Sequence, residues 1–154
     1  MKALICTIFL SMILNDKLPN DVRWVRESDE YKALCNQVYG QAIYKIKKKM
    51  TYNKFSLNQS NINNYAVIMD LDETVLDNSD YQVGLFERNE SFNMNSWAKW
   101  VEREEAKLVP GAKEYIELLR KNNIQIIFIS NRMHARLDAT KNNMKKLKDF
   151  NKYT

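Results

Sequence analysis

YAVIMDLDETVLDNS, residues 65–79, joins an apolar run to a group of carboxylates, and this junction decides the fold. The run 65–70 is apolar up to Asp70, which predicts a strand buried on both faces in a parallel sheet. Asp72 and Thr74 follow at two-residue steps. Such residues can simply cap a turn, but two carboxylates at a sheet edge repel each other unless a cation lies between them. The pattern therefore favours a loop that carries chemistry.

A second apolar run, IQIIFIS at 124–130, predicts a second buried strand that ends in Ser130. Strand, helical crossover and strand make a β-α-β unit, whose strands are expected to be parallel with a right-handed connection. Ligands bind beyond the carboxyl ends of the strands in such sheets. We therefore expect Asp70 and Ser130 to face one crevice.

Helical periodicity covers much of the remaining chain. Residues 28–50 repeat apolar side chains at three- and four-residue steps, with Ser28 as N-cap, and an Asn-rich loop is expected over 51–64. Cys35 is predicted to be a small core residue of that first helix. Three further helices are expected over residues 94–105, 110–123 and 135–148.

The expected helix over 94–105 carries an aromatic stripe. Trp97, Trp100 and Val101 fall on one helical face. Such a stripe packs into a core or a lid more often than it forms a platform for a ligand.

The first 14 residues, MKALICTIFLSMIL, have the length of the apolar region of a signal peptide and are too short to cross a bilayer. They lack a small-x-small cleavage site, so a membrane anchor and a buried N-terminal helix remain alternatives. Export to the periplasm, the outer membrane or the medium is expected from the signal-peptide interpretation. Cys6 lies inside this segment, so it and Cys35 do not make a disulfide framework.

Composition places the chain among ordinary soluble domains and excludes several functions. It has 154 residues, 45% of them hydrophobic, and a net charge of +5. The excess lysines fall in two runs that are typical of solvated helix surface. Nucleic-acid binding is therefore not expected. A small anionic substrate would suit the positive electrostatic field of the chain. His134 is the only histidine, which excludes phosphatase chemistry that needs a pair of histidines.

The carboxylate loop and its surroundings resemble a known family. DLDETVLDNS at 70–79 resembles the first signature of the haloacid dehalogenase (HAD) superfamily, and within it the class C acid phosphatases, the bacterial lipoprotein 5'-nucleotidase group. Further stretches agree in the same order: WVRESDEYKALCNQVYG at 24–40, WAKWV at 97–101, LVPGAKEYIELL at 108–119 and IIFISNR at 126–132. The resemblance implies an α/β fold over residues 24–154, an incomplete HAD-like Rossmannoid parallel sheet with an N-terminal helix and a small helical lid.

The same resemblance implies a hydrolase that acts on phosphomonoesters. Asp70 would attack phosphorus and form an aspartyl-phosphate, and Asp72 would protonate the leaving oxygen and then activate water. Like charges in proximity favour keeping one carboxyl protonated, which favours activity at acid pH. The remaining predicted phosphate-binding residues are Thr74, Ser130, Asn131 and Arg132.

Magnesium is the cofactor that the resemblance implies. The Asp70 side chain and the main-chain carbonyl of Asp72 would bind Mg²⁺. The superfamily's later lysine motif and its acidic metal-binding motif have no match up to residue 154, so the interpretation at this point is a truncated domain whose complementing C-terminal half is a potential partner. The alternative is an inactive half-domain that binds phosphate or a partner chain without turnover.

Substrate identity is not fixed by these residues. By resemblance, nucleoside monophosphates are the leading substrate candidates, because the family's aromatic lid suits stacking on a base. The residues proposed for stacking are Tyr81, Phe86 and Trp97.

Overall fold

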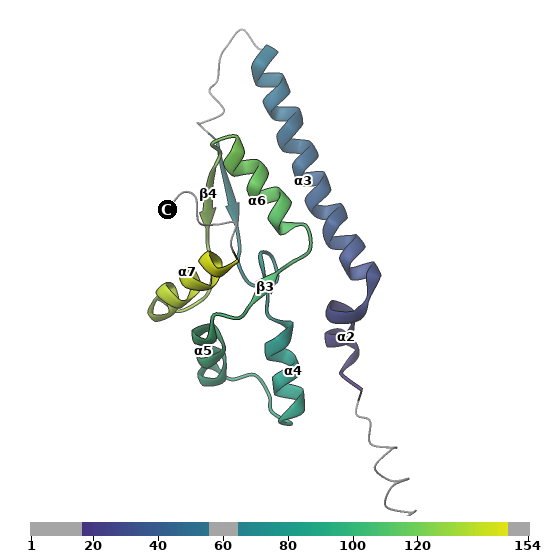
Figure 1. Ribbon diagram of the computed structural model, residues 1–154, viewed down its shortest axis with the longest axis vertical. Coiled ribbons are helices and arrows are strands. Elements are labelled where there is room, and N and C mark those ends of the chain that lie inside the picture. The colour runs from purple at the N-terminus through teal and green to yellow at the C-terminus, as the bar shows by residue number, and fades with distance from the viewer. Residues whose placement is uncertain (1–16, 56–64, 148–154) are drawn as a thin grey trace, which may run out of the picture.

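The computed structural model describes residues 17–55 and 65–147, and Figure 1 shows its mixed α/β arrangement. The elements, in chain order, are α2 (Asn20–Glu27), α3 (Asp29–Phe55), β1 (Ala66–Met69), β2 (Leu76–Asp77), α4 (Ser79–Glu87), α5 (Met94–Arg103), β3 (Lys107–Leu108), α6 (Ala112–Lys121), β4 (Gln125–Phe128), η2 (His134–Arg136) and α7 (Leu137–Lys146).

β1 and β4 form the predicted parallel pair. Ala66 lies beside Gln125, and Met69 lies beside Phe128. The Ile129 N–H extends the ladder by donating to the Met69 carbonyl at 2.9 Å. Because parallel strands share their carboxyl edge, the segment after β1 and the segment after β4 leave the sheet side by side.

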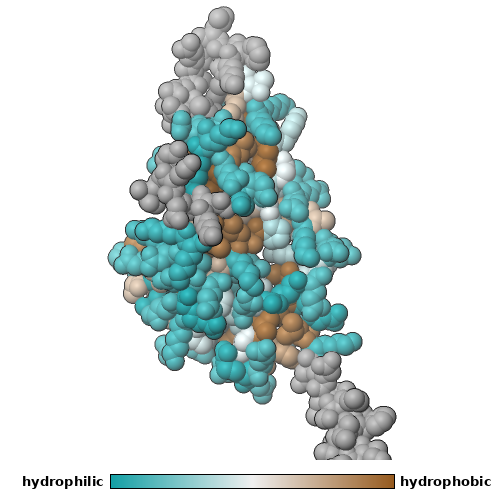
Figure 2. Space-filling model, viewed as in Figure 1, coloured by the Kyte–Doolittle hydropathy of each residue, from teal (hydrophilic) through white to brown (hydrophobic). Residues whose placement is uncertain are grey.

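The prediction that both strands are buried on both faces is wrong. Side chains alternate along a strand, and one set (Val67, Met69, Ile126 and Phe128) packs against the core. The opposite set is open: Ile68 is 65% exposed, Ile127 38% and Ile129 59%. The described helices α6 and α3 lie on one side of the strands in Figure 1, which explains why only one face is covered. On the face drawn in Figure 2, apolar residues gather in a few patches on a hydrophilic surface.

Helix α3 is longer than its sequence pattern predicts. The Ser28 hydroxyl accepts a hydrogen bond from the Tyr31 N–H at 2.9 Å, which confirms the predicted N-cap. The helix continues to Phe55, so the loop predicted over 51–64 starts too early; no Gly or Pro interrupts residues 51–55. Cys35 packs, half-buried, against the core as predicted.

The segment between β1 and α5 contains structure that the sequence pattern does not predict. β2 pairs antiparallel with β3, Leu76 beside Leu108 and Asp77 beside Lys107. Asp77 Oδ1 also accepts the Ser79 N–H at 2.8 Å, which satisfies the first backbone donor of α4. The aromatic helix α5 agrees with its prediction, because Trp100 and Val101 are buried and Trp97 packs against the core.

Helix α6 approaches α3 closely at its start. Gly111 has φ +84°, a left-handed conformation that favours glycine. A Cβ at this position would lie 2.9 Å from the Tyr39 Cβ. The predicted helix start at Pro110 and Gly111 is therefore also the point at which α3 and α6 meet.

Helix α7 is fixed to the rest of the domain by a buried amide. Asn143 is 3% exposed; its Oδ1 accepts the Ala106 N–H at 3.1 Å, and its Nδ2 donates to the Ala106 carbonyl at 2.9 Å. This two-way pairing satisfies backbone groups that a buried loop would otherwise leave unpaired.

The predicted N-terminal signal segment, residues 1–14, and Cys6 lie outside the described residues. Among the helices that the structure describes, none is both long and apolar enough to cross a membrane.

Candidate active site

The loop after β1 is a tight turn that displays its carboxylates at the sheet edge. The Leu71 carbonyl accepts hydrogen bonds from the backbone N–H groups of Val75 and Leu76, both at 2.8 Å, and Glu73 adopts φ +57°. Helix α3 holds the turn from outside, because the Tyr39 hydroxyl donates to the Thr74 carbonyl at 2.5 Å. Burial raises the pKa of Tyr39 to about 12, so its proton stays available for this bond at acid and neutral pH.

Asp70 and Ser130 lie on neighbouring segments at the carboxyl edge, as expected from the parallel pairing. Asp70 is exposed to solvent. Ser130 is half-buried, and its Oγ accepts the Arg132 N–H at 3.1 Å, which leaves its own hydroxyl proton free to donate. Asn131 is exposed beside it.

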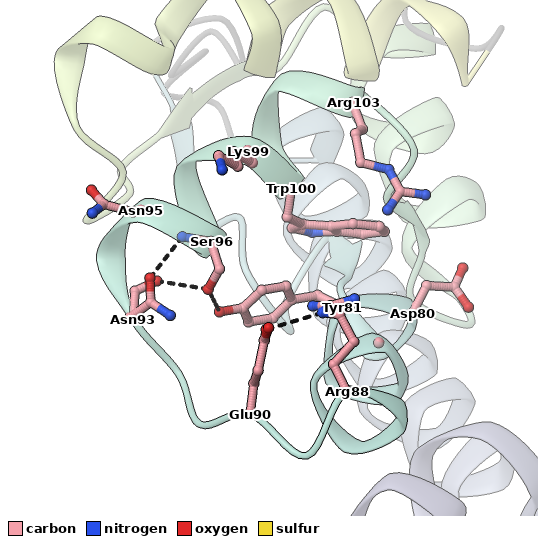
Figure 3. A pocket seen from close by; sticks show the side chains of 11 residues that line it. Asp80, Tyr81, Arg88, Glu90, Asn93, Asn95, Ser96, Lys99, Trp100 and Arg103 are labelled. Carbon is pink, nitrogen blue, oxygen red and sulfur yellow. Dashed lines mark hydrogen bonds and ion pairs between the residues drawn. The ribbon is translucent and has the colours of Figure 1, made fainter.

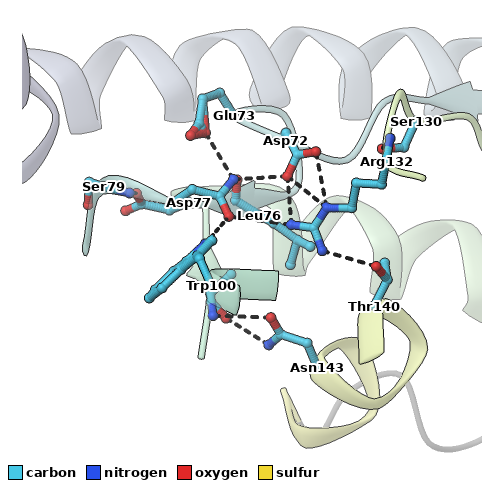
Figure 4. Close-up of polar contacts among 12 residues, drawn as sticks. Asp72, Glu73, Leu76, Asp77, Ser79, Trp100, Ser130, Arg132, Thr140 and Asn143 are labelled. Atoms are coloured by element: carbon cyan, nitrogen blue, oxygen red, sulfur yellow. Dashed lines mark hydrogen bonds and ion pairs between the residues drawn. The ribbon is translucent and has the colours of Figure 1, made fainter. Parts of the chain in front are cut away.

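Arg132 and Asp72 form an ion pair between the two segments (Figure 4). Arg132 Nη2 lies 2.6 Å from Asp72 Oδ1, and its Nε lies 3.1 Å from both carboxylate oxygens. A third nitrogen, Nη1, donates to the Thr140 hydroxyl of α7 at 3.1 Å. The Arg132 side chain is 6% exposed, against 27% for Asp72, so this pair is largely shielded from screening by solvent.

Asn78 and Trp100 belong to the same network and were not singled out as site residues from the sequence. Asn78 is 1% exposed; its Nδ2 donates to Asp72 Oδ1 at 2.9 Å, and its Oδ1 accepts from Trp100 Nε1 at 2.9 Å. The only sequence signal was that Asn78 lies within the DLDETVLDNS stretch. Its contacts connect segments distant in the chain, so no local pattern reveals them.

Glu73 adds an acidic group beside the loop. Desolvation of its carboxyl raises its pKa, with Asp77 and Asp72 acting in the same direction, while hydrogen bonds from Asn78 oppose the rise. Part of the Glu73 side chain stays exposed. Burial therefore makes the Glu73 carboxyl harder to ionise than that of an isolated glutamate.

The donors at the sheet edge suit a hard cation, although they are few. The carboxylate of Asp70 and the main-chain carbonyl of Asp72 are oxygen ligands of the kind that Mg²⁺ prefers. Within residues 17–55 and 65–147, no three or more His, Cys, Asp or Glu side chains are grouped to hold a metal ion. The predicted pair of ligands thus fits part of a magnesium site.

A cavity of about 470 Å³ opens next to the ion pair. Ser130 and Arg132 line it, together with His134 and Lys141 and with apolar side chains from β4 and α7. His134 is exposed there. Lys141 gives the cavity a cationic group that suits an anionic ligand, whereas the Arg132 charge is paired with Asp72.

A second pocket, of about 420 Å³, lies between α4 and α5 (Figure 3). Tyr81 and Trp100 line it, and the Tyr81 hydroxyl lies 2.9 Å from the Ser96 hydroxyl. The Tyr81 ring packs edge-on against Trp97 at 5.2 Å between centroids. The aromatic residues proposed for stacking, Tyr81 and Trp97, therefore contact each other, whereas Phe86 lies half-buried on α4.

Comparisons with known proteins agree on one family. The model of HAD superfamily subfamily IIIB (acid phosphatase) matches residues 9–154. A solved class C acid phosphatase from Bacillus anthracis superposes with a TM-score of 0.72 and 28% identity, over 84% of this chain and 52% of that chain. A class C acid phosphatase from Bacillus anthracis with tungstate bound superposes with a TM-score of 0.68 and 29% identity, over 82% of this chain and 50% of that chain. The chain thus spans about half the length of the solved structures it matches.

Proposed function

Because the chain belongs to the acid phosphatase family, subfamily IIIB of the HAD superfamily, we propose that it carries the nucleophile and the acid–base group of a magnesium-dependent phosphatase. The substrates are phosphomonoesters. The observation that carries the proposal is the Asp72–Arg132 ion pair, which brings the DLDET loop after β1 and the SNR segment after β4 to one edge of the sheet.

The proposed reaction has two displacement steps. Asp70 attacks phosphorus with a carboxylate oxygen, the bond from phosphorus to the leaving oxygen breaks, and Asp72 gives that oxygen a proton. Asp72 then takes a proton from water as the water oxygen attacks the aspartyl-phosphate. Inorganic phosphate leaves and Asp70 is regenerated. The exposed position of Asp70 leaves it open to an incoming phosphate.

Phosphate binding is assigned to the groups around Asp70. The Ser130 hydroxyl has its proton free to donate to a phosphoryl oxygen, and Asn131 is exposed beside it. Thr74 supports the loop through its carbonyl bond to Tyr39. Magnesium, when bound by the Asp70 carboxylate and the Asp72 carbonyl, reduces repulsion between carboxylate and phosphate.

Nucleoside monophosphates are the proposed substrate class. The Trp97 ring lies 5.6 Å from the Arg132 guanidinium carbon, so the aromatic cluster of Tyr81, Phe92 and Trp97 adjoins the ion pair. Phe92 is 58% exposed, which leaves aromatic surface available for a base.

Phosphate release tests this proposal. We expect the chain to release phosphate from an aryl phosphate at about pH 5 to 6 with Mg²⁺, and to lose at least about 90% of this activity in EDTA. A nucleoside monophosphate tested in parallel should be turned over more efficiently, and Trp97→Ala should reduce only that advantage. Release that is unaffected by EDTA would contradict the magnesium assignment.

The open sheet face favours a second candidate, a half-domain that pairs with a complementing polypeptide. Ile68, Ile127 and Ile129 form an apolar surface on a two-stranded sheet whose outer edges carry no strand among the described residues. Isolated two-stranded pairs are marginal, and open edges attract further strands. Since the solved relatives are about twice as long, the occupant we propose is a polypeptide that supplies their remaining part.

Co-expression with the polypeptide encoded directly after this chain separates the two candidates. Binding that restores release, and that Ile127→Lys weakens, supports an enzyme completed by docking on this face. Binding without release supports a partner-binding half-domain. If the chain releases phosphate fully by itself, no complementing half is needed and the docking proposal fails.

A further inference from the structure

Asn78 uses both ends of its side-chain amide at the site. Besides its bonds to Asp72 and Trp100, its Nδ2 lies 3.3 Å from the Leu76 carbonyl and 3.3 Å from Glu73 Oε2, and its Oδ1 lies 3.4 Å from Arg132 Nη2. A buried amide that lost these partners would leave several groups unsatisfied. Asn78 therefore lies where the loop after β1, helix α5 and the Asp72–Arg132 ion pair meet.

The chemistry of its neighbours fixes which way the Asn78 amide points. The Asp72 carboxylate can only accept, and the Trp100 indole N–H can only donate. An amide flipped by 180° would aim its NH₂ at the indole N–H and its oxygen at the carboxylate. Asn78 is thus required to donate toward the loop and to accept from α5.

The two oxygens of Asp72 are not equivalent. Oδ1 accepts from Asn78 Nδ2, Arg132 Nη2 and Arg132 Nε, whereas Oδ2 accepts only from Arg132 Nε, at 3.1 Å. Oδ1 is therefore saturated with donors. Oδ2 is the oxygen that keeps an open acceptor position.

We infer that Asn78 is a positioning residue that couples helix α5, through Trp100, to the proposed acid–base carboxylate of Asp72. It holds Oδ1 so that Oδ2 is presented to the leaving group, and Arg132 acts with it in holding that carboxylate. All three guanidinium nitrogens of Arg132 are engaged by protein groups, Asp72, Asn78 and Thr140. This inference rests on the proposed function, because it assigns a role in that reaction.

The first test detects the coupling between Trp100 and Asp72 by NMR and needs no measurement of turnover. In the chain labelled with ¹⁵N-tryptophan, Asp72→Asn is expected to shift the Trp100 indole N–H resonance although Trp100 contacts Asn78 and not Asp72. The matched control is Asp29→Asn, a carboxylate that is 94% exposed on α3 and should leave that resonance in place. Trp24, 44% exposed on α2, serves as an internal reference.

The route is tested by repeating Asp72→Asn in an Asn78→Ser background, where the shift at Trp100 should be lost. A Trp100 resonance that Asp72→Asn leaves unmoved overturns the inference, and so does an equal shift in both backgrounds. If Asn78→Ser does not fold, the single Asp72 variant still decides, because it needs no change at Asn78.

The second test separates positioning from binding. Trp100→Phe removes the indole N–H but keeps an aromatic ring at this position, and it is expected to lower kcat about tenfold while KM stays within about twofold. Trp24→Phe, the same change on α2, should alter neither constant. An unchanged kcat in the Trp100 variant contradicts the inference. If the wild-type preparation releases no phosphate, the proposed function fails. The Trp100 indole resonance still tests whether Asn78 couples Trp100 to Asp72.

Discussion

Replacing Asp70 by Asn is expected to reduce phosphate release at least about a thousandfold, in the chain alone or in its complex with a complementing polypeptide. An amide oxygen is a poor nucleophile and cannot form the acyl-phosphate, and the change also removes a charged ligand from the proposed magnesium site. Asp70 is exposed, so the fold should not depend on it. Thermal unfolding of the variant should therefore match the wild type.

Asp29→Asn is the matched control for this prediction, because it makes the same chemical change at a carboxylate that is 94% exposed in the first turn of α3. Its rate should equal that of the wild type. A variant at Asp70 that keeps more than about a tenth of the rate would show that another group attacks phosphorus, and the proposed role of the DLDET loop would have to be abandoned.

Gly111→Ala is expected to lower the free energy of unfolding by about 2–5 kcal/mol. A Cβ at φ +84° costs about 1–2 kcal/mol, and crowding in a packed interface adds about 1–3 kcal/mol. The new methyl would lie 2.9 Å from the Tyr39 Cβ. Tyr39 also holds the Thr74 carbonyl, so the loop should loosen as α3 and α6 move apart.

Gly40→Ala is the comparison that isolates this effect, since Gly40 lies within α3 with no atom within 4 Å of an added Cβ. There the substitution is expected to stabilise the chain by about 0.5–1 kcal/mol, because alanine favours helix more than glycine does. Urea denaturation measures the free energy of unfolding of both variants. Midpoints that shift in the same direction would contradict the packing argument at Gly111.

Much of the framework follows from local pattern. The apolar runs ending in Asp70 and Ser130 predict β1 and β4, because a continuous apolar run between turn signals is typical of parallel strands. Ser28 predicts the start of α3, and the Trp97 and Trp100 stripe predicts α5. These features depend on neighbours within a few residues. The roles given to Asp70, Asp72, Thr74, Ser130, Asn131 and Arg132 in binding and catalysis remain predictions.

Other features escape the sequence because their causes lie far apart in the chain. The short β2–β3 pair is one of them, because it brings Asp77 beside Lys107 from a separate segment of the chain. Which face of the strands stays open depends on where α6 and α3 pack, since side chains on both faces are apolar. Periodicity describes a segment and says nothing about the segments that will cover it.

The sequence by itself determined the parallel strand pair, the helices α3, α5, α6 and α7, the family and the carboxylate loop, because each depends on residues that are close together in the chain. Only the tertiary structure decided that Arg132 would hold Asp72, that Asn78 would join both to Trp100, and that one sheet face would stay open. The physical reason is that hydrogen bonds and burial depend on distances in space, and segments as far apart as the Asp72 loop and Arg132 meet only once the chain has folded.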